Sequence, residues 1–302
     1  MIDGDSSVAR PLGISVVIVN WNGGDALLAC VESLAAEASP QASTVQEVIV
    51  VDNASSDGSA VAARDAFPWL TVIDSGANLG FAAGANLGAD RACGKVIVFV
   101  NPDARVAPGA VAALVGALAE LPGAGIAGGG LVDPRGRWQP GAARFGALGH
   151  LVLDTTLGRL PTRLRTRPYA VDWVYGTFMA VRHDLFRRLG GFDRAYFLYG
   201  EDMDLCHRAA EIGARTIHVP AARAVHGANL SATQRYGSGR EAEVVKGELR
   251  FYGRRRPHQV RLFRAVAACK FGTKAALAAV VGRSGTAATY GRVVRACLTA
   301  PA

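Results

Sequence analysis

The chain has 302 residues, half of them hydrophobic and 19% charged, which excludes a disordered or fibrous protein. The net charge of +8 is unevenly distributed, because residues 249–302 contain eleven Arg and Lys residues and no acid, against 22 basic and 25 acidic residues before them. The five cysteines are scattered and include no C-x-x-C pair, which argues against a disulfide framework and a zinc site. The first thirteen residues lack the apolar run of a secretory signal, so we predict a cytoplasmic protein.

The first third of the chain alternates runs rich in β-branched residues, the first of them free of charge, with stretches of helical composition. Such runs are typical of strands buried on both faces of a parallel sheet. The expected strands are residues 14–19, 47–51, 70–73 and 95–100, and the expected helices between them are 25–38, 57–67 and 84–93. This alternation predicts an α/β fold with an open, mostly parallel sheet flanked by helices.

The pattern is less regular after residue 100. Expected helices cover residues 108–119, 184–189 and 201–212, and expected strands cover 125–132, 171–181 and 216–219. Residues 145–169 lack periodicity and predict a mobile loop over one face. We divide the chain into a domain of residues 1–243 and a basic, helical tail of residues 244–302.

Polar loops follow each of the first four expected strands. They are Asn20–Gly24, Asp52–Gly58, Ser75–Gly80 and Asn101–Asp103. Turn chemistry alone enriches Asn, Asp and Gly in any single loop. Ligands of open parallel sheets bind beyond the carboxyl ends of the strands. Four such loops on one edge therefore predict a binding site there.

Two residues are candidates for metal binding. A single carboxylate such as Asp103 on a sheet-edge loop suits a hard divalent cation that also binds a nucleotide diphosphate. A structural role for Asp103, as an Asx turn or a helix cap, is the alternative. His226 also follows an apolar run, and it becomes a candidate ligand only if the fold brings it to Asp103.

Three carboxylates occur within four residues at an expected helix start: Glu201, Asp202 and Asp204. The helix dipole stabilises acids in this position, which is a purely structural explanation. Their mutual repulsion nevertheless favours a function, and Glu201 and Asp202 are candidates for a general base. Asp204 precedes Arg208 by one turn and is expected to pair with it.

Five motifs occur together in a fixed order: ISVVIVNWN (14–22), VDNASSDG (51–58), NLGFAAGAN (78–86), NPD (101–103) and GFDRAYFLYGEDMDL (191–205). With them the chain resembles the family 2 glycosyltransferases of GT-A fold over residues 14 to about 231. Within that family it is most similar to the rhamnosyltransferase-like branch, which builds bacterial cell-wall and surface glycans.

The resemblance implies a role for each matching residue. Asp202 matches the catalytic base of a Glu-Asp pair whose first member is Glu201. Asp103 and His226 match the ligands of a divalent cation, Mg²⁺ or Mn²⁺, although Asn101 stands where a further Asp is common. The residues implied in nucleotide-sugar binding are Asn20, Asp52, Asn78, Gly80, Asn86 and Asn101.

The implied activity is inverting transfer of a sugar, L-rhamnose from dTDP-L-rhamnose, onto a lipid-linked or cell-wall and surface glycan acceptor. Two alternatives remain open at this point. The donor could be a UDP-hexose or UDP-galactofuranose, or the protein could bind nucleotide sugars without catalysis. A dinucleotide dehydrogenase is disfavoured because no G-x-G-x-x-G motif follows the first strand.

The basic tail interleaves Arg and Lys with aromatic and aliphatic residues from Arg250 to Lys274. This composition suits a helix lying on an anionic membrane surface, and no apolar stretch is long enough to span a bilayer. A solvated basic face packed on the domain is the alternative. Nucleic acid is not expected as a partner, since no recognised motif accompanies the charge. We therefore predict a peripheral protein on the inner face of the cell membrane.

Overall fold

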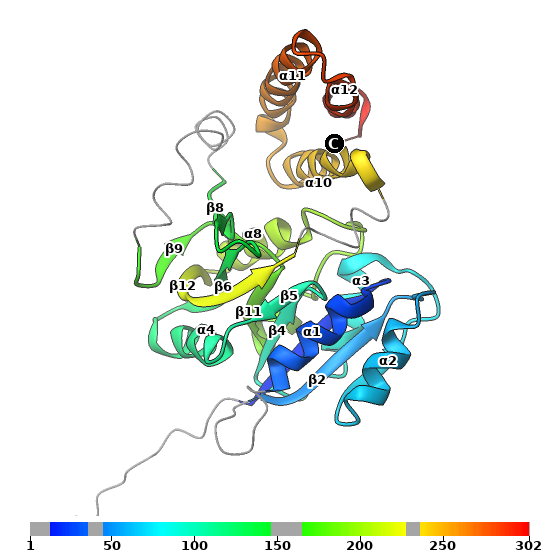
Figure 1. The fold of residues 1–302 in the computed structure, drawn as a ribbon. Coiled ribbons are helices and arrows are strands. Elements are labelled where there is room, and N and C mark those ends of the chain that lie inside the picture. The colour runs from blue at the N-terminus through cyan, green and yellow to red at the C-terminus, as the bar shows by residue number, and fades with distance from the viewer. Residues whose placement is uncertain (1–12, 36–44, 146–164, 228–235, 302) are drawn as a thin grey trace, which may run out of the picture.

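The computed structural model describes residues 13–35, 45–145, 165–227 and 236–301, and within them one ten-stranded sheet forms the centre of the molecule (Figure 1). Its main path runs in the order β3-β2-β1-β4-β11-β6-β12-β5. The strands on this path are β1 (Ile14–Asn20), β2 (Val45–Asp52), β3 (Thr71–Asp74), β4 (Val96–Val100), β5 (Ala104–Val106), β6 (Ala124–Val132), β11 (Phe178–Arg182) and β12 (Arg215–His226). Short strands β7 (Trp138–Gln139) and β9 (Tyr169–Val171) pair with β6 and β12.

Strands β3, β2, β1 and β4 are parallel neighbours, so their carboxyl ends share one edge. Asn20 is paired in register with Asp52, which places the first two predicted loops side by side. The side chains of β1 and β4 are buried throughout, as expected for a strand covered on both faces. The helices around the sheet are α1 (Gly24–Ala35), α2 (Ser59–Ala66), α3 (Gly80–Ala89), α4 (Ala110–Glu120), α7 (His183–Arg188) and α8 (Glu201–Glu211). The predicted mostly parallel α/β sheet flanked by helices is confirmed.

The second half of the sheet differs from the prediction in two places. The single strand expected over residues 171–181 is instead split into the end of β9, β10 (Trp173–Val174) and β11, and β10 pairs separately with β8 (Ala142–Ala143). The strand expected over 216–219 continues to His226, with a register shift between Val219 and Arg223. Pro220 lies in this shift, and it has no backbone N–H to donate to the neighbouring strand. The regular pairing is interrupted there, but the strand continues beyond it. Most of the loop predicted over residues 145–169 lies outside the described residues.

The C-terminal region is helical, as predicted, and lies beyond one end of the sheet (Figure 1). It comprises η1 (Gly237–Gly239), α10 (Arg240–Arg255), α11 (Pro257–Val280) and α12 (Ser284–Thr299). Leu249 and Phe251 of α10 are fully buried in the same apolar core as Phe99 of β4. None of the described helices is long and apolar enough to cross a bilayer. The boundary placed after residue 243 falls inside α10, and the division into two domains stays a prediction.

Candidate active site

Asn20 and Asp52 lie at the carboxyl ends of β1 and β2, where the sheet predicts a binding edge. Asn20 is completely buried, and its Nδ2 donates to Asp52 Oδ1 over 3.2 Å and to Ser59 Oγ over 2.9 Å. Ser55 Oγ donates to the same Asp52 oxygen over 2.6 Å. These bonds fix the Asp52 carboxylate at the edge, with Oδ2 accepting a longer bond of 3.4 Å from the Ser55 backbone.

The next loop along this edge is held by Asn53, which is not among the predicted site residues. Asn53 Nδ2 donates to the carbonyl of Gly80 over 3.0 Å, and its Oδ1 accepts from the backbone N–H of Leu79 over 3.2 Å. Asn78 Oδ1 accepts from the Gly80 N–H over 3.1 Å. Gly80 has φ of 80°, and a Cβ there would lie 2.3 Å from the Phe197 carbonyl oxygen. Only glycine fits this approach between α3 and the loop before α8.

The fold brings His226 to Asp103, as the sequence required for a shared role. Residue 226 pairs with Ala104 across β12 and β5, which places His226 Nε2 3.4 Å from Asp103 Oδ1. Gln139 fixes the orientation of the imidazole. Its Nε2 donates to the His226 backbone carbonyl over 3.3 Å, and its Oε1 therefore lies 2.9 Å from Nδ1 of the His226 ring. In the neutral ring this assigns the proton to Nδ1 and turns the Nε2 lone pair toward the carboxylate.

This pair has the chemistry of a partial metal site. His226 Nε2 is buried and makes no hydrogen bond to any described residue, so an imidazole lone pair and a carboxylate oxygen face one another. The described residues contain no group of three His, Cys, Asp or Glu side chains that could enclose a cation. A Mg²⁺ or Mn²⁺ ion that keeps waters and binds substrate phosphates fits two protein ligands. The donors present therefore suit a cation completed by a diphosphate.

Asp202 occupies the first turn of α8, where its carboxylate is oriented by the backbone. Oδ2 accepts from the Gly176 N–H over 3.1 Å and Oδ1 from the Met203 N–H over 2.8 Å. Burial raises the pKa of Asp202 to about 6, although these two N–H groups act in the opposite direction. Burial and the neighbouring Asp202 charge raise the pKa of Glu201 well above its usual range. Asp202 is thus a stronger base than an exposed aspartate and is still largely ionised at pH 7.

A cleft of about 510 Å³ collects four of the predicted site residues: Asn101, Glu201, Asp202 and His226. Asn101 follows β4, and its backbone N–H donates to the Thr177 carbonyl over 2.9 Å. The volume is within the range of ligand sites for small molecules. Asp103 adjoins this group through its contact with His226. Four other predicted residues lie further along the same edge and do not line the cleft: Asn20, Asp52, Asn78 and Gly80. Adjacent strands are about 5 Å apart, so Asp52 on β2 is two strand spacings from Asn101.

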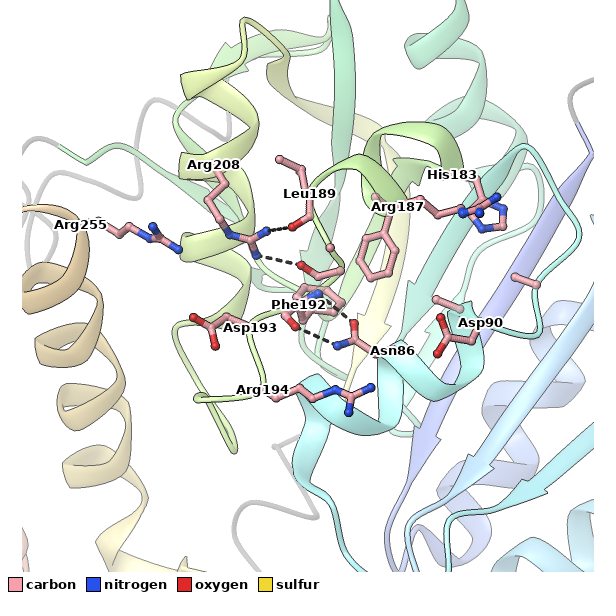
Figure 2. A pocket seen from close by; sticks show the side chains of 15 residues that line it. Asn86, Asp90, His183, Arg187, Leu189, Phe192, Asp193, Arg194, Arg208 and Arg255 are labelled. Atoms are coloured by element: carbon pink, nitrogen blue, oxygen red, sulfur yellow. Dashed lines mark hydrogen bonds between the residues drawn. The ribbon is translucent and has the colours of Figure 1, made fainter.

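Asn86 lies elsewhere. It borders a second cavity, of about 860 Å³, and both polar atoms of its amide bond the backbone of Phe192 over 2.8 Å (Figure 2). This pairing ties α3 to the loop that precedes α8. The described contacts of Asn86 are therefore structural, and its predicted part in nucleotide-sugar binding stays a prediction.

Asp204 anchors α8 and forms the predicted pair with Arg208. Its carboxylate is fully buried, with Oδ2 2.6 Å from Arg208 Nε. The sequence did not indicate a second partner, Arg255 of α10, whose Nε lies 2.6 Å from Oδ1. Arg208 also donates to the carbonyls of Leu189 and Gly191, which it reaches at the edge of the second cavity (Figure 2). The helix that carries Asp202 is thus connected to α10 through a buried carboxylate.

Comparison with known proteins agrees with this architecture. The family model described as glycosyl transferase family 2 matches residues 15–190. N-acetylglucosaminyl-diphospho-decaprenol L-rhamnosyltransferase of Mycobacterium tuberculosis is 32% identical over 201 residues, covering 59% of this chain and 66% of the relative. The rhamnosyltransferase WbbL of Escherichia coli is 39% identical over 87 residues, which cover 28% of this chain and 33% of WbbL.

Solved structures share the fold at low sequence identity. A mannosyltransferase from Pyrobaculum calidifontis, solved with GDP-Man and Mn²⁺, superposes with a TM-score of 0.62 at 18% identity over 96% of this chain and 87% of its own. GalNAc-T7, solved with UDP, GalNAc and Mn²⁺, gives a TM-score of 0.59 at 18% identity over 81% of this chain and 50% of its own. With the fold of the GT-A glycosyltransferases and a family model that matches more than half of its length, the chain belongs to glycosyl transferase family 2.

Proposed function

We propose that the protein is an inverting glycosyltransferase that moves L-rhamnose from dTDP-L-rhamnose onto a lipid-linked or cell-wall glycan acceptor. The observation that carries the proposal is the joint position of Asp202, Asn101 and His226 in one cleft at the sheet edge. The named relatives support the sugar and the type of acceptor, since the M. tuberculosis protein is an L-rhamnosyltransferase acting on a diphospho-decaprenol compound.

Asp202 acts as the general base in this mechanism. It accepts the proton of the acceptor hydroxyl while that oxygen bonds to the anomeric carbon, and the bond from this carbon to the donor phosphate breaks. The nucleoside diphosphate leaves with the electron pair. A single displacement inverts the anomeric configuration and needs no enzyme nucleophile. The N–H groups of Gly176 and Met203 keep the carboxylate oriented without neutralising it.

The donor nucleotide extends along the edge of the sheet. Asp52 binds the base or ribose, and Asp103 and His226 are the residues that hold the divalent cation. When bound, that cation offsets the negative charge that develops on the leaving diphosphate. The two strand spacings between Asp52 and Asn101 leave room for a ribose and a diphosphate between them.

The protein acts at the inner face of the cell membrane, where lipid-linked acceptors are available. The basic C-terminal helices support this location. The residues exposed at the end of α11 include Leu277 and Val280, which are 62% and 84% exposed, next to Arg283. Apolar side chains among cations match the chemistry of an anionic lipid surface.

The test is a donor panel of dTDP-L-rhamnose, a UDP-hexose and UDP-galactofuranose, assayed with Mg²⁺ or Mn²⁺ and with EDTA. We expect cation-dependent turnover of dTDP-L-rhamnose and its loss in EDTA. Asp202→Asn should lower kcat by roughly 10²- to 10⁴-fold with donor affinity unchanged. The matched control is Glu211→Gln on the same helix, whose side chain is 56% exposed.

Three results would contradict the proposal. Full turnover by Asp202→Asn would remove this residue from the role of base. Preferred turnover of a UDP-sugar would replace the donor. Binding of nucleotide sugars without turnover of any of them would indicate a binding protein.

A further inference from the structure

The outer half of the cleft is built by the C-terminal helices, not by the sheet. Its lining includes Arg240 and Val244 of α10 and Phe263, Lys270 and Lys274 of α11. These residues lie outside the part of the chain that the family model matches. The inner half contains Asp202 and His226, so the cleft runs from the reacting end to a wall that α10 and α11 supply.

This outer wall carries an excess of positive charge. Lys270 and Lys274 are one turn apart on α11 and are both half-buried. Their ammonium groups lie against the Phe271 ring, 5.7 and 5.5 Å from its centroid. Lys274 is also 5.6 Å from the ring centroid of Tyr290 on α12. Cation–π contacts of this kind hold an ammonium group in place. The cations that α10 and α11 contribute to the lining are Arg240, Lys270 and Lys274, and the acids that they contribute are Glu241 and Glu248.

The same wall is aromatic. Tyr252 and Phe263 stack with ring centroids 4.5 Å apart, and Phe271 is the residue that follows Lys270. Trp173 and Tyr175 line the cleft as well, with ring centroids 4.7 Å apart. Rings beside cations complement a ligand that combines an anionic group with a hydrocarbon chain.

Two carboxyl oxygens near the cleft lack a hydrogen-bond partner among the described residues. Glu201 Oε2 and Glu241 Oε2 are buried and make no hydrogen bond to any described residue. Both residues line the cleft. Buried polar atoms in native proteins nearly always bond a protein group, water or a ligand. The hydroxyls of an acceptor sugar would satisfy both oxygens and bring one hydroxyl to Asp202.

We propose that α10 and α11 form the acceptor site, in which Arg240, Lys270 and Lys274 bind the diphosphate of a prenyl-linked acceptor and the aromatic side chains contact its hydrocarbon chain. The inference rests on the proposed function, which requires a lipid-linked acceptor. It adds the residues that recognise that acceptor and assigns them to the C-terminal helices. The order along the cleft is base, sugar, diphosphate and chain.

The experiment measures binding of farnesyl diphosphate to the full-length protein by calorimetry. EDTA is present, so that a cation at Asp103 and His226 cannot capture the diphosphate. Lys274→Gln should weaken binding about tenfold, since it removes one charge-assisted contact. Arg240→Gln is a second variant on the neighbouring helix with the same expected direction. The matched control is Lys246→Gln on α10, whose side chain is 48% exposed and pairs with Glu243 outside the cleft lining.

Further ligands separate the sources of affinity. Farnesol and inorganic pyrophosphate should each bind more weakly than farnesyl diphosphate, because each lacks half of the recognised structure. The donor product dTDP should not displace farnesyl diphosphate. Displacement by dTDP, or equal binding by Lys274→Gln, Arg240→Gln and the wild type, would overturn the acceptor site.

Binding and catalysis are scored independently. No sugar is transferred in the calorimetric assay, so loss of the proposed rhamnosyl transfer would leave a positive result intact as a prenyl-diphosphate site. Conversely, an active transferase that does not bind farnesyl diphosphate would retain the proposed function and refute this acceptor site.

Discussion

The contact between α8 and α10 offers a sharp test of what stabilises α8, the helix that carries Asp202. Asp204 is fully buried and accepts two bonds of 2.6 Å, from Arg208 Nε and Arg255 Nε. Arg255→Met keeps most of the aliphatic side chain, removes one of these bonds and leaves Asp204 paired with Arg208. A hydrogen bond to a charged group contributes about 1.5–3 kcal/mol, so we expect the free energy of unfolding to fall by about 2 kcal/mol.

The adjacent residue provides the control. Arg254 pairs with Asp193 over 2.9 Å, but the two side chains are 48% and 20% exposed, and such pairs contribute about 0–1 kcal/mol. Urea unfolding of Arg255→Met and Arg254→Met, with unchanged slopes, measures both losses. Equal losses for the two variants would refute the argument that Asp204 is the buried link between the helices.

Two further predictions concern pH and the membrane. The pKa of Asp202 is about 6 in the folded protein, against 3.8 for an ordinary aspartate, so the folded protein binds the carboxyl proton more tightly than the unfolded chain. The stabilisation from this proton is complete below pH 4 and is lost as pH rises through 6. The stability of Asp202→Asn relative to wild type should therefore increase by up to about 3 kcal/mol between pH 4 and 7, and a pH-independent difference in urea unfolding would contradict this. For the membrane, replacing exposed Val280 and Val281 by Ser should weaken sedimentation with anionic vesicles by about tenfold relative to the wild type, whereas unchanged binding would exclude the end of α11 as the contact.

Much of the fold follows from local pattern. Runs rich in β-branched residues identify β1, β2 and β4, because the interior of a strand covered on both faces has no position for a charge. The pairing of Asp204 with Arg208 is equally local, since residues four apart on a helix are neighbours. The meeting of Asp103 with His226 was conditional on topology, and the antiparallel pairing of β5 with β12 fulfils that condition.

Other features depend on contacts that no local pattern encodes. Gln139 orients His226 across 87 residues from a two-residue strand, which is too short to produce a periodic signal. Arg255 reaches Asp204 across 51 residues. Asn86 shows the reverse case. It belongs to a motif that predicted ligand binding, but the hydrogen bonds described for its amide are structural. Residue type and order indicate a site, but its hydrogen-bond partners are decided by the packing of distant elements.

The C-terminal helices combine roles that a truncation could not separate. Gly200 precedes α8 with φ of 92°, and a Cβ there would lie 2.9 Å from the Gly247 carbonyl oxygen of α10. Leu249 and Phe251 extend this contact into the core. Deleting residues 249–302 would therefore expose apolar surface, remove one partner of Asp204 and open the outer wall of the cleft together. Loss of activity in such a deletion would not identify a membrane role, whereas single substitutions at the end of α11 change the surface and leave the support of α8 intact.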